Sequence, residues 1–178
     1  MELFLREPTI NDKDEVIKMC IELENVDDDV KFEGSKNLKI VLEKSYEDYL
    51  EEINNRKHIE DTNPNEVNQT SFILVDKDAH VYGALNIRHH LNDELLRYGG
   101  NIGYLIKPSE RRKGYSILQL KYAIVIAKTQ FEMDRAFITC RNSNFKSMRT
   151  ILRCGGYSAG EDYIDEKNIP HTRFWIDL

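Results

Sequence analysis

The side chains best suited to chemistry stand in one basic segment, 107–116, which reads Lys-Pro-Ser-Glu-Arg-Arg-Lys-Gly-Tyr-Ser. It follows an apolar run typical of a buried strand and precedes a run typical of a helix. The first turn of a helix leaves backbone N–H groups without acceptors and carries the positive end of the helix dipole. Gly114 lets a ligand approach the backbone, and Arg111, Arg112 and Lys113 add charge-assisted hydrogen bonds. The segment predicts a site for a phosphate.

Neither of the two common nucleotide-binding loops is present. The sequence contains no Gly-x-x-x-x-Gly-Lys-Ser/Thr pattern and no Gly-x-Gly-x-x-Gly pattern. A basic turn before a helix is by itself a weak signal, because a solvated surface turn has the same composition. Other groups must therefore support the prediction of a binding site.

Two adjacent histidines, His89 and His90, are candidates for proton transfer, since an unperturbed imidazole titrates near pH 6.5. The alternative is a pair that packs or is solvated. Glu94 is a weaker candidate, and Tyr104 and Tyr157 could donate a proton, although aromatic residues on strands more often belong to the core. The remaining histidines are too scattered to complete a metal site, so we expect no metal.

The elements that position these residues follow from hydrophobic periodicity. We expect one α/β domain over residues 1–178, with flanking helices on a central mixed sheet of about six to seven strands. The polar stretch 60–70 predicts a long surface loop, and the helix at 114–128 is apolar on most sides, which predicts deep burial. The expected strands are 3–6, 71–75, 81–88, 101–107, 136–140, 157–164 and 173–176. The expected helices are 9–24, 35–42, 45–56, 114–128 and 144–154.

Composition excludes several classes of protein. The chain has 178 residues, of which 40% are hydrophobic, and a net charge of −6, so it is not built to coat nucleic acid phosphates. The longest apolar run, 122–127, is too short to cross a bilayer, and the start lacks the basic head of a signal peptide. We expect a cytoplasmic protein without membrane association. Its three cysteines form no Cys-x-x-Cys pair and are expected to be reduced.

Charge is distributed unevenly. Residues 7–66 include 18 acidic and 8 basic side chains, whereas residues 101–153 include 3 acidic and 11 basic ones. The basic half fits an anion site, and the acidic half favours a cationic partner. The alternative is that both halves simply carry solvated helix faces.

Two motifs flank the helix expected at 114–128. The first is a strand, a proline and then Arg-x-x-Gly-x-Ser at 111–116; the second is a strand followed by Asn-x-x-Ser at 144–147, opening a helix that ends in Gly-Gly-Tyr. They resemble the Arg/Gln-x-x-Gly-x-Gly/Ala and Asn-x-x-Ala/Ser motifs of the GNAT superfamily of acetyl-CoA-dependent N-acetyltransferases. Ser116 replaces the last Gly or Ala. The order of elements is similar over nearly the whole chain.

The resemblance implies a GNAT-like fold whose fourth and fifth strands, 101–107 and 136–140, splay apart to admit acetyl-CoA. The fourth strand would pair with the pantetheine amides, the turn would hold the pyrophosphate, and Asn144 would border the thioester. On this resemblance the coenzyme-binding residues are Leu105, Ile106, Lys107, Arg111, Arg112, Lys113, Gly114, Tyr115, Ser116 and Asn144.

The catalytic pattern departs from the family at two positions. Many GNAT enzymes place a Glu base at the start of the fourth strand and a Tyr acid seven residues after the motif Asn. Here these positions hold Asn101 and Ile151, and neither can transfer a proton at neutral pH. Either His89 and His90 substitute for them, or catalysis rests on positioning.

The function expected is transfer of an acetyl group from acetyl-CoA to a primary amine, with a cationic acceptor favoured by the acidic half. One alternative is a non-catalytic acyl-CoA-binding or sensing protein on the same fold. Another is a phosphate-binding module unrelated to coenzyme A. The terminal strands offer an edge with which a second copy could pair as a homodimer.

Overall fold

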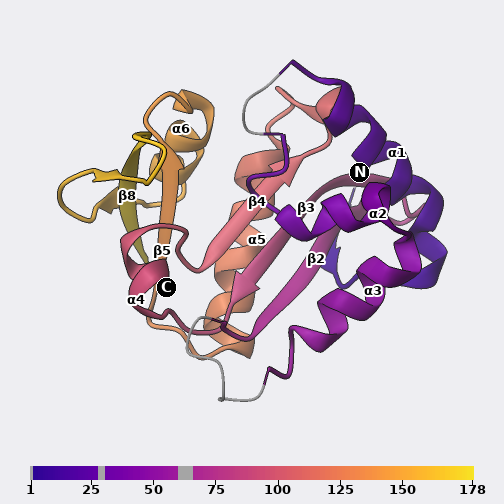
Figure 1. Ribbon diagram of the computed structural model, residues 1–178, viewed down its shortest axis with the longest axis horizontal. Helices are drawn as coiled ribbons and strands as arrows, with labels where there is room; N and C mark the ends of the chain where they lie inside the picture. Colours follow the sequence, from indigo (N-terminus) through magenta and orange to yellow (C-terminus); the bar gives the residue numbers. More distant parts are fainter. Residues whose placement is uncertain (1, 28–30, 60–65) are drawn as a thin grey trace.

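The computed structural model describes residues 2–27, 31–59 and 66–178 (Figure 1). The strands are β1 Leu3–Arg6, β2 Gln69–Asp76, β3 Val81–Arg88, β4 Ile102–Ile106, β5 Arg135–Arg141, β6 Tyr157–Ser158, β7 Tyr163–Ile164 and β8 Pro170–Asp177. The α-helices are α1 Lys13–Asn25, α2 Lys39–Glu43, α3 Tyr46–Asn55, α4 Asp93–Arg97, α5 Tyr115–Gln130 and α6 Phe145–Arg153. Short 3₁₀ turns lie at Ile10–Asp12, Lys36–Leu38 and Pro108–Glu110. The predicted α/β order is confirmed except at two places: α4 lies between β3 and β4, and the single strand expected at 157–164 is two short strands, β6 and β7, separated by residues 159–162.

Strands β1 to β4 form an antiparallel sheet in the order β1-β2-β3-β4, and β2 and β3 make the hairpin. Successive side chains of a strand point to opposite faces of its sheet. In β3, Ala84 packs in the cluster under α1, α2 and α3, whereas Leu85 and Ile87 pack in the cluster that includes α5. Asn86 and Arg88 therefore share the α1–α3 face with Ala84.

The remaining strands form a second sheet in the order β5-β8-β6, with β7 also paired to β8. Among the described residues a single bridge, Gly100↔Ile138, joins the two sheets. Beside it the Asn101 N–H donates to the Phe137 carbonyl (2.6 Å), and Asn101 Oδ1 accepts from the Phe137 N–H (2.9 Å). Strands β4 and β5 form no ladder beyond this joint, and their ribbons diverge in Figure 1. The expected splaying is confirmed, but the eight described strands form two four-stranded antiparallel sheets in place of one mixed sheet.

The helices cover the first sheet on both faces. Helices α1, α2 and α3 lie on one face, and α5 lies on the other, where it also packs against β5 and α6. The expectation that α5 is deeply buried is wrong. Only one stripe of it is buried, and Val125 is 57% exposed, because a helix that lies on one face of a sheet leaves its outer side in water.

Two further expectations need correction. The first part of the predicted loop, 60–65, lies outside the described residues, but Gln69 and Thr70 at its end are buried in β2, where they pair with Arg88 and Ile87. The sequence analysis also misses α4, a five-residue helix with no buried residue and hence no periodic signal.

The cysteines follow the prediction. All three thiols are free; Cys20 and Cys140 are buried, and Cys154 is partly so. Burial raises the pKa of Cys20 to about 12 and that of Cys140 to about 11, which keeps both thiols protonated. No helix within the described part of the chain combines the length and apolarity required to span a bilayer.

The joint between the sheets requires a glycine. Gly100 has φ +70°, and a Cβ there would lie 2.2 Å from the Phe137 carbonyl oxygen. Gly155 has φ +91° with nothing within 4 Å of an added Cβ, so it is a matched control for backbone strain alone. We expect Gly155→Ala to cost about 1–2 kcal/mol. Gly100→Ala should cost about 2–5 kcal/mol, since overpacking is added.

Urea unfolding of both variants and the wild type measures these costs. Equal destabilisation by the two substitutions would mean that β5 moves freely away from Gly100, and the joint would then not hold the sheets in register.

Candidate functional site

The turn between β4 and α5 has the geometry of an anion site. Arg112 and Gly114 adopt positive φ angles of 67° and 86°, and Gly114 is the N-cap of α5. The five backbone N–H groups at 112–116 have no hydrogen-bond acceptor among the described residues. A Cβ on Gly114 would meet nothing within 4 Å, so the space beside these donors is open. A phosphate group fits the donors and the helix dipole together.

Ion pairs connect this turn to α1 and to His80, the residue that precedes β3. His80 lies between two carboxylates, with Nδ1 2.9 Å from Glu15 Oε2 and Nε2 3.3 Å from Glu110 Oε1. The buried Lys107 places Nζ 3.5 Å from the same Glu15 oxygen. Burial alone would raise the pKa of Glu15, but hydrogen bonding by Lys18 and the charge of Lys107 hold it at about 2. The side chain of Lys107 therefore faces α1, away from the gap between the sheets.

The other cations of the turn lie closer to the open side. The Arg111 Nε–H donates to the carbonyl of Ile106 (3.2 Å), which folds this side chain back onto the end of β4. Lys113 Nζ lies 2.9 Å from Glu110 Oε2, and both Arg112 and Lys113 are exposed. Arg112 and Lys113 can thus approach a bound anion from solvent.

The register of β4 decides which backbone groups face the gap between the sheets. The Arg88 N–H donates to the Asn101 carbonyl, and the Lys107 N–H donates to the Tyr82 carbonyl. Bonded pairs alternate in an antiparallel ladder, so odd-numbered residues of β4 bond to β3 and even-numbered residues face the other edge. Of the three residues predicted to pair with the coenzyme, only Ile106 faces that edge. Leu105 and Lys107 are engaged with β3, and the second outward residue is Tyr104.

Asn144 and its neighbours hold the start of α6 against β4. Asn144 is the N-cap, and its Oδ1 accepts a hydrogen bond from the Ser147 N–H at 3.1 Å. Ser147 Oγ lies 2.9 Å from the Tyr104 hydroxyl, and Ser116 Oγ lies 3.2 Å from Thr150 Oγ1. Burial raises the pKa of Tyr104, which keeps its hydroxyl protonated. The first motif is therefore bonded through Ser116 to helix α6, and the second motif is bonded through Ser147 to β4.

The two positions that depart from the family pattern are structural in this chain. Asn101 is buried, and its Nδ2 donates to the Arg88 carbonyl (3.2 Å) while its Oδ1 accepts from Phe137. Ile151 is fully buried in the cluster between α5, α6 and β5. Neither side chain is available to a substrate.

The histidine pair lies at the far end of α5 from the turn. His89 stacks on Phe131, the C-cap of α5, with ring centroids 4.2 Å apart, and its Nε2 lies 2.9 Å from Thr70 Oγ1. A helix of 16 residues spans about 24 Å, so the turn and the pair are well separated. Burial, then repulsion by His90 and His58, lowers the pKa of His89.

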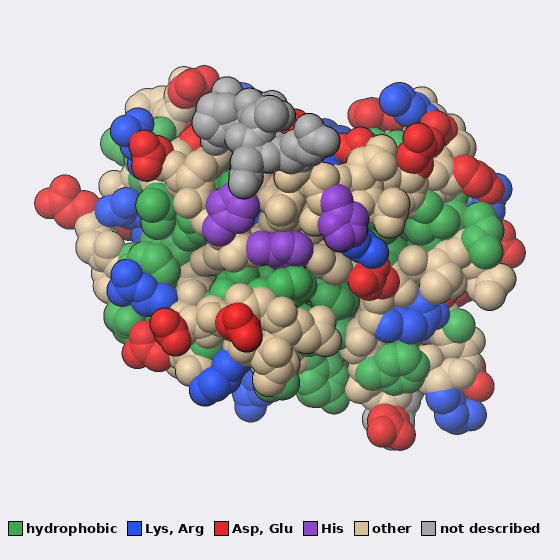
Figure 2. All heavy atoms as spheres, turned by 90° about the horizontal axis from the view of Figure 1, so that it is seen from below, with side chains coloured by type: hydrophobic (Ala, Val, Ile, Leu, Met, Phe, Trp, Pro, Cys, Tyr) green, Lys and Arg blue, Asp and Glu red, His purple; other side chains and the backbone are tan. Residues whose placement is uncertain are grey.

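Figure 2 shows histidine side chains gathered on one face of the molecule. Within the described residues no group of three or more His, Cys, Asp or Glu side chains is placed to hold a metal ion.

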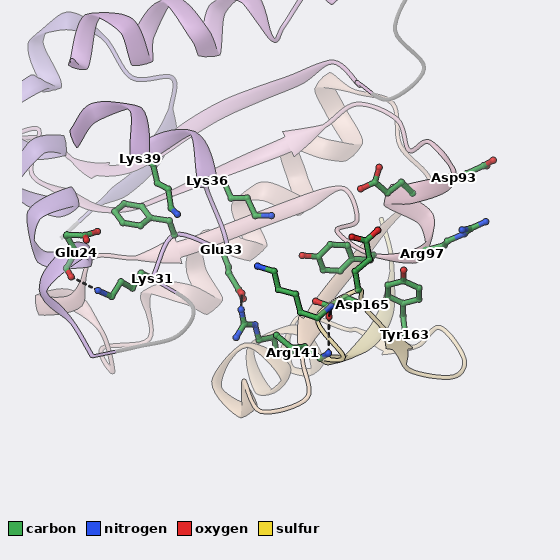
Figure 3. A pocket seen from close by; sticks show the side chains of 16 residues that line it. Glu24, Lys31, Glu33, Lys36, Lys39, Asp93, Arg97, Arg141, Tyr163 and Asp165 are labelled. Atoms are coloured by element: carbon green, nitrogen blue, oxygen red, sulfur yellow. Dashed lines mark hydrogen bonds and ion pairs between the residues drawn. The ribbon is translucent and has the colours of Figure 1, made fainter. Parts of the chain in front are cut away.

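A cleft of about 1050 Å³ opens on the α1–α2 side of the gap (Figure 3). Its lining comes from the segment before α2, from α4, from the end of β5 and from the β7–β8 connection. Six carboxylates and six cations line it, and two glutamates and three lysines come from the acidic segment 7–66. Figure 3 shows Glu33 pointing at Arg141, with which it forms an ion pair across the two sheets. The acidic excess of residues 7–66 is therefore not found among the residues that line the cleft.

The segment that carries Glu33 packs directly on β4. A Cβ on Gly34 would lie 1.9 Å from the Tyr104 carbonyl oxygen, and a Cβ on Gly103 would lie 2.6 Å from the Gly34 carbonyl oxygen. Only glycines allow two backbones to approach so closely. The segment before α2 therefore forms the wall of the cleft at the middle of β4.

A smaller cavity of about 360 Å³ adjoins the cleft and shares Glu33, Lys36 and Glu94 with it. Its floor is formed by β2 and β3, where Asn86 Nδ2 donates to Gln69 Oε1 (3.2 Å) beside Arg88. The candidate residues predicted from the sequence include His89 but not Arg88. The alternation of side chains within 81–88 was the available signal, because it puts Asn86 and Arg88, polar residues of a buried strand, on one face.

Comparisons with known proteins agree with this geometry. A family model described as an acetyltransferase (GNAT) domain matches residues 2–156. No curated protein sequence matches the chain. A solved spermidine N-acetyltransferase from Vibrio cholerae, in complex with CoA and spermine, is similar with a TM-score of 0.63 and 19% identity, over 98% of this chain and 95% of that chain. A putative phosphinothricin N-acetyltransferase is similar with a TM-score of 0.60 and 16% identity, over 99% of both chains.

At such identities the two solved structures show the fold, and the family model carries the assignment. It spans β1 to the end of α6, including both motifs, the joint at Gly100 and the turn at the start of α5. The chain belongs to the GNAT family of acetyltransferases and is an acyltransferase of that type.

Proposed function

We propose that this enzyme transfers the acetyl group of acetyl-CoA to a primary amine. The observation that carries the proposal is the row of five N–H groups at 112–116, which have no acceptor among the described residues and border open space at Gly114. Unpaired donors at a helix start favour a phosphate, and GNAT acetyltransferases use acetyl-CoA. The lining of the cleft mixes cations and carboxylates, so the proposal specifies an amine and not a purely cationic acceptor.

Each part of the coenzyme has a fitting group in this chain. The N–H groups of the turn would hold the pyrophosphate, with Arg112 and Lys113 adding charge from solvent. The outward backbone groups of Ile106 and Tyr104 would pair with the pantetheine amides. Bound acetyl-CoA supplies an activated thioester. The chain would orient it toward the cleft, and such positioning contributes a large share of the rate.

Proton transfer is the second requirement, because the attacking amine must lose its proton. We retain His89 and His90 as the proposed residues for this step. The Arg88 N–H donates to the Asn101 carbonyl, so the pair lies at the strand end where many GNAT enzymes carry a Glu. Burial lowers the pKa of His89 below 6.5, which leaves a neutral imidazole able to accept a proton at pH 7.

Two rival functions make different predictions. A non-catalytic acyl-CoA sensor on this fold would bind acetyl-CoA and release no CoA with any amine. A phosphate-binding module unrelated to CoA would gain thermal stability from other phosphates but not from CoA. Both can be tested by measuring CoA release and the thermal midpoint with a panel of amines and phosphates. A cytoplasmic location and a homodimer that pairs along the edge formed by β6 and β7 also stay predictions.

Replacement of Gly114 by Val tests the coenzyme site. Val is strained at φ +86°, and its side chain would fill the open space beside the N–H groups. We expect Gly114→Val to remain folded and to lose binding of CoA. Gly155→Val has the same kind of backbone strain at φ +91° and should keep its affinity. Calorimetric titration with CoA compares the two, and unchanged affinity in Gly114→Val would remove the turn from the coenzyme site.

Replacement of the histidine pair tests proton transfer. We expect His89→Ala with His90→Ala to lower turnover at least ~10-fold at saturating acetyl-CoA, within the range of general acid–base catalysis. Lys128→Ala, a change to an exposed side chain near the end of α5, should leave turnover unchanged. Wild-type turnover in the double variant, with a lower thermal midpoint from the lost Phe131 stacking, would assign the pair to packing.

A further inference from the structure

The smaller cavity contains a cation without a counter-ion. Arg88 Nη1 donates hydrogen bonds to the carbonyl oxygens of Gly100 (2.7 Å) and Gly99 (3.4 Å). No carboxylate of the described residues forms an ion pair with Arg88. Burial lowers the pKa of Arg88, and the charge of Arg56 lowers it further, yet a guanidinium stays protonated in proteins. A partly desolvated, unpaired charge is unfavourable, and a bound anion would relieve it.

The carboxylates that line this cavity do not neutralise Arg88. All three are exposed, and they are Glu33, Glu66 and Glu94. Glu33 already pairs with Arg141, and Arg56 pairs with Glu52 on its own helix at 2.5 Å. The cavity is therefore positive at its floor, where Arg88 and Arg56 lie close enough to repel each other. Its exposed charged residues are these three glutamates and Lys36, so carboxylates outnumber cations where it opens to solvent.

We propose that the smaller cavity binds a carboxylate group of the acceptor, so that the acceptor is an amine of the amino acid class. The inference rests on the function proposed above, because it names the acceptor of that reaction. A guanidinium donates two parallel hydrogen bonds to a carboxylate, and the carboxylate supplies the missing counter-charge of Arg88. Glu94, which the cavity shares with the larger cleft, offers negative charge to the ammonium end.

Size and charge both discriminate against a polyamine here. The volume of about 360 Å³ lies at the small end of ligand sites and suits a molecule of amino acid size. A diamine would bring a second cation toward Arg88 and Arg56, and such a like-charge contact rejects the wrong ligand. An amino acid matches both the positive floor and the negative opening.

Matched ligand pairs test this acceptor class. Lysine and cadaverine differ only by a carboxylate, as do leucine and isoamylamine. Calorimetric titration of the full chain saturated with CoA should show at least ~10-fold tighter binding of lysine and leucine, as a charge-assisted pair predicts. Arg88→Gln should bring each ratio close to one, and Arg56→Gln should lower it. Arg153→Gln, a change to an exposed arginine on α6 outside both cavities, should keep the ratio.

Several outcomes would overturn the inference. These are equal affinity within each pair, tighter binding of the diamine, or a carboxylate preference that survives in folded Arg88→Gln and Arg56→Gln variants. Release of CoA from acetyl-CoA separates this inference from the proposed function. If the chain binds the carboxylate-bearing ligands more tightly but releases CoA with no amine, the proposed acetyl transfer is wrong and the proposed carboxylate site stands. If CoA is released with cadaverine but not with lysine, the proposed acetyl transfer stands and the proposal of an amino acid acceptor is wrong.

Discussion

The side chain of Asn101 joins the two sheets at the point from which β4 and β5 diverge. Its Oδ1 accepts from the Phe137 N–H on β5, and its Nδ2 donates to the Arg88 carbonyl on β3. A carboxylate at this position could accept from Phe137 but could not donate to Arg88. The amide thus fastens the two sheets at one point, next to Gly100, and leaves the edge of β4 beyond it unpaired. The residue that stands in place of the usual base therefore strengthens the joint beside which the gap between the strands begins.

Local signals account for what the sequence predicts well. The turn at the start of α5 is recognisable because a proline ends the strand, three cations follow, and a glycine permits a positive φ before the helix. The hairpin of β2 and β3 follows from alternating apolar residues on either side of a polar turn. Sequence patterns whose meaning depends on tertiary packing led to wrong predictions. Helix α5 is apolar on most sides, yet Val125 is in water, because burial is set by what packs against a helix and not by its composition. The splaying of β4 and β5 came from family resemblance, since no local pattern encodes it.

The acceptor side illustrates why net charge along a chain predicts a site poorly. Residues 7–66 carry a large excess of carboxylates, but several of these, among them Asp14, Glu43 and Glu47, lie on exposed helix faces, and the segment contributes more lysines than glutamates to the cleft. The cavity residues also come from separate segments that meet only after folding. His89 directly follows Arg88, the last residue of β3, and a shift of one position along a strand moves a side chain to the opposite face. Sequence reasoning therefore named His89 and passed over its neighbour Arg88, which lines the smaller cavity.

Arg88 links the joint between the two sheets to the floor of the smaller cavity. Its backbone bonds to Asn101, and its guanidinium bonds to Gly100, so the charge at the floor of the cavity and the joint between the sheets share the same few residues. Deprotonating a lysine-like amine at pH 7 costs about 5 kcal/mol. Holding two reactants in register can supply about 7–11 kcal/mol. Positioning therefore exceeds the deprotonation cost even with Asn101 and Ile151 in place of a base and an acid. If the proposed acetyl transfer is correct, the residues that fix geometry can therefore contribute more to the rate than a single proton carrier.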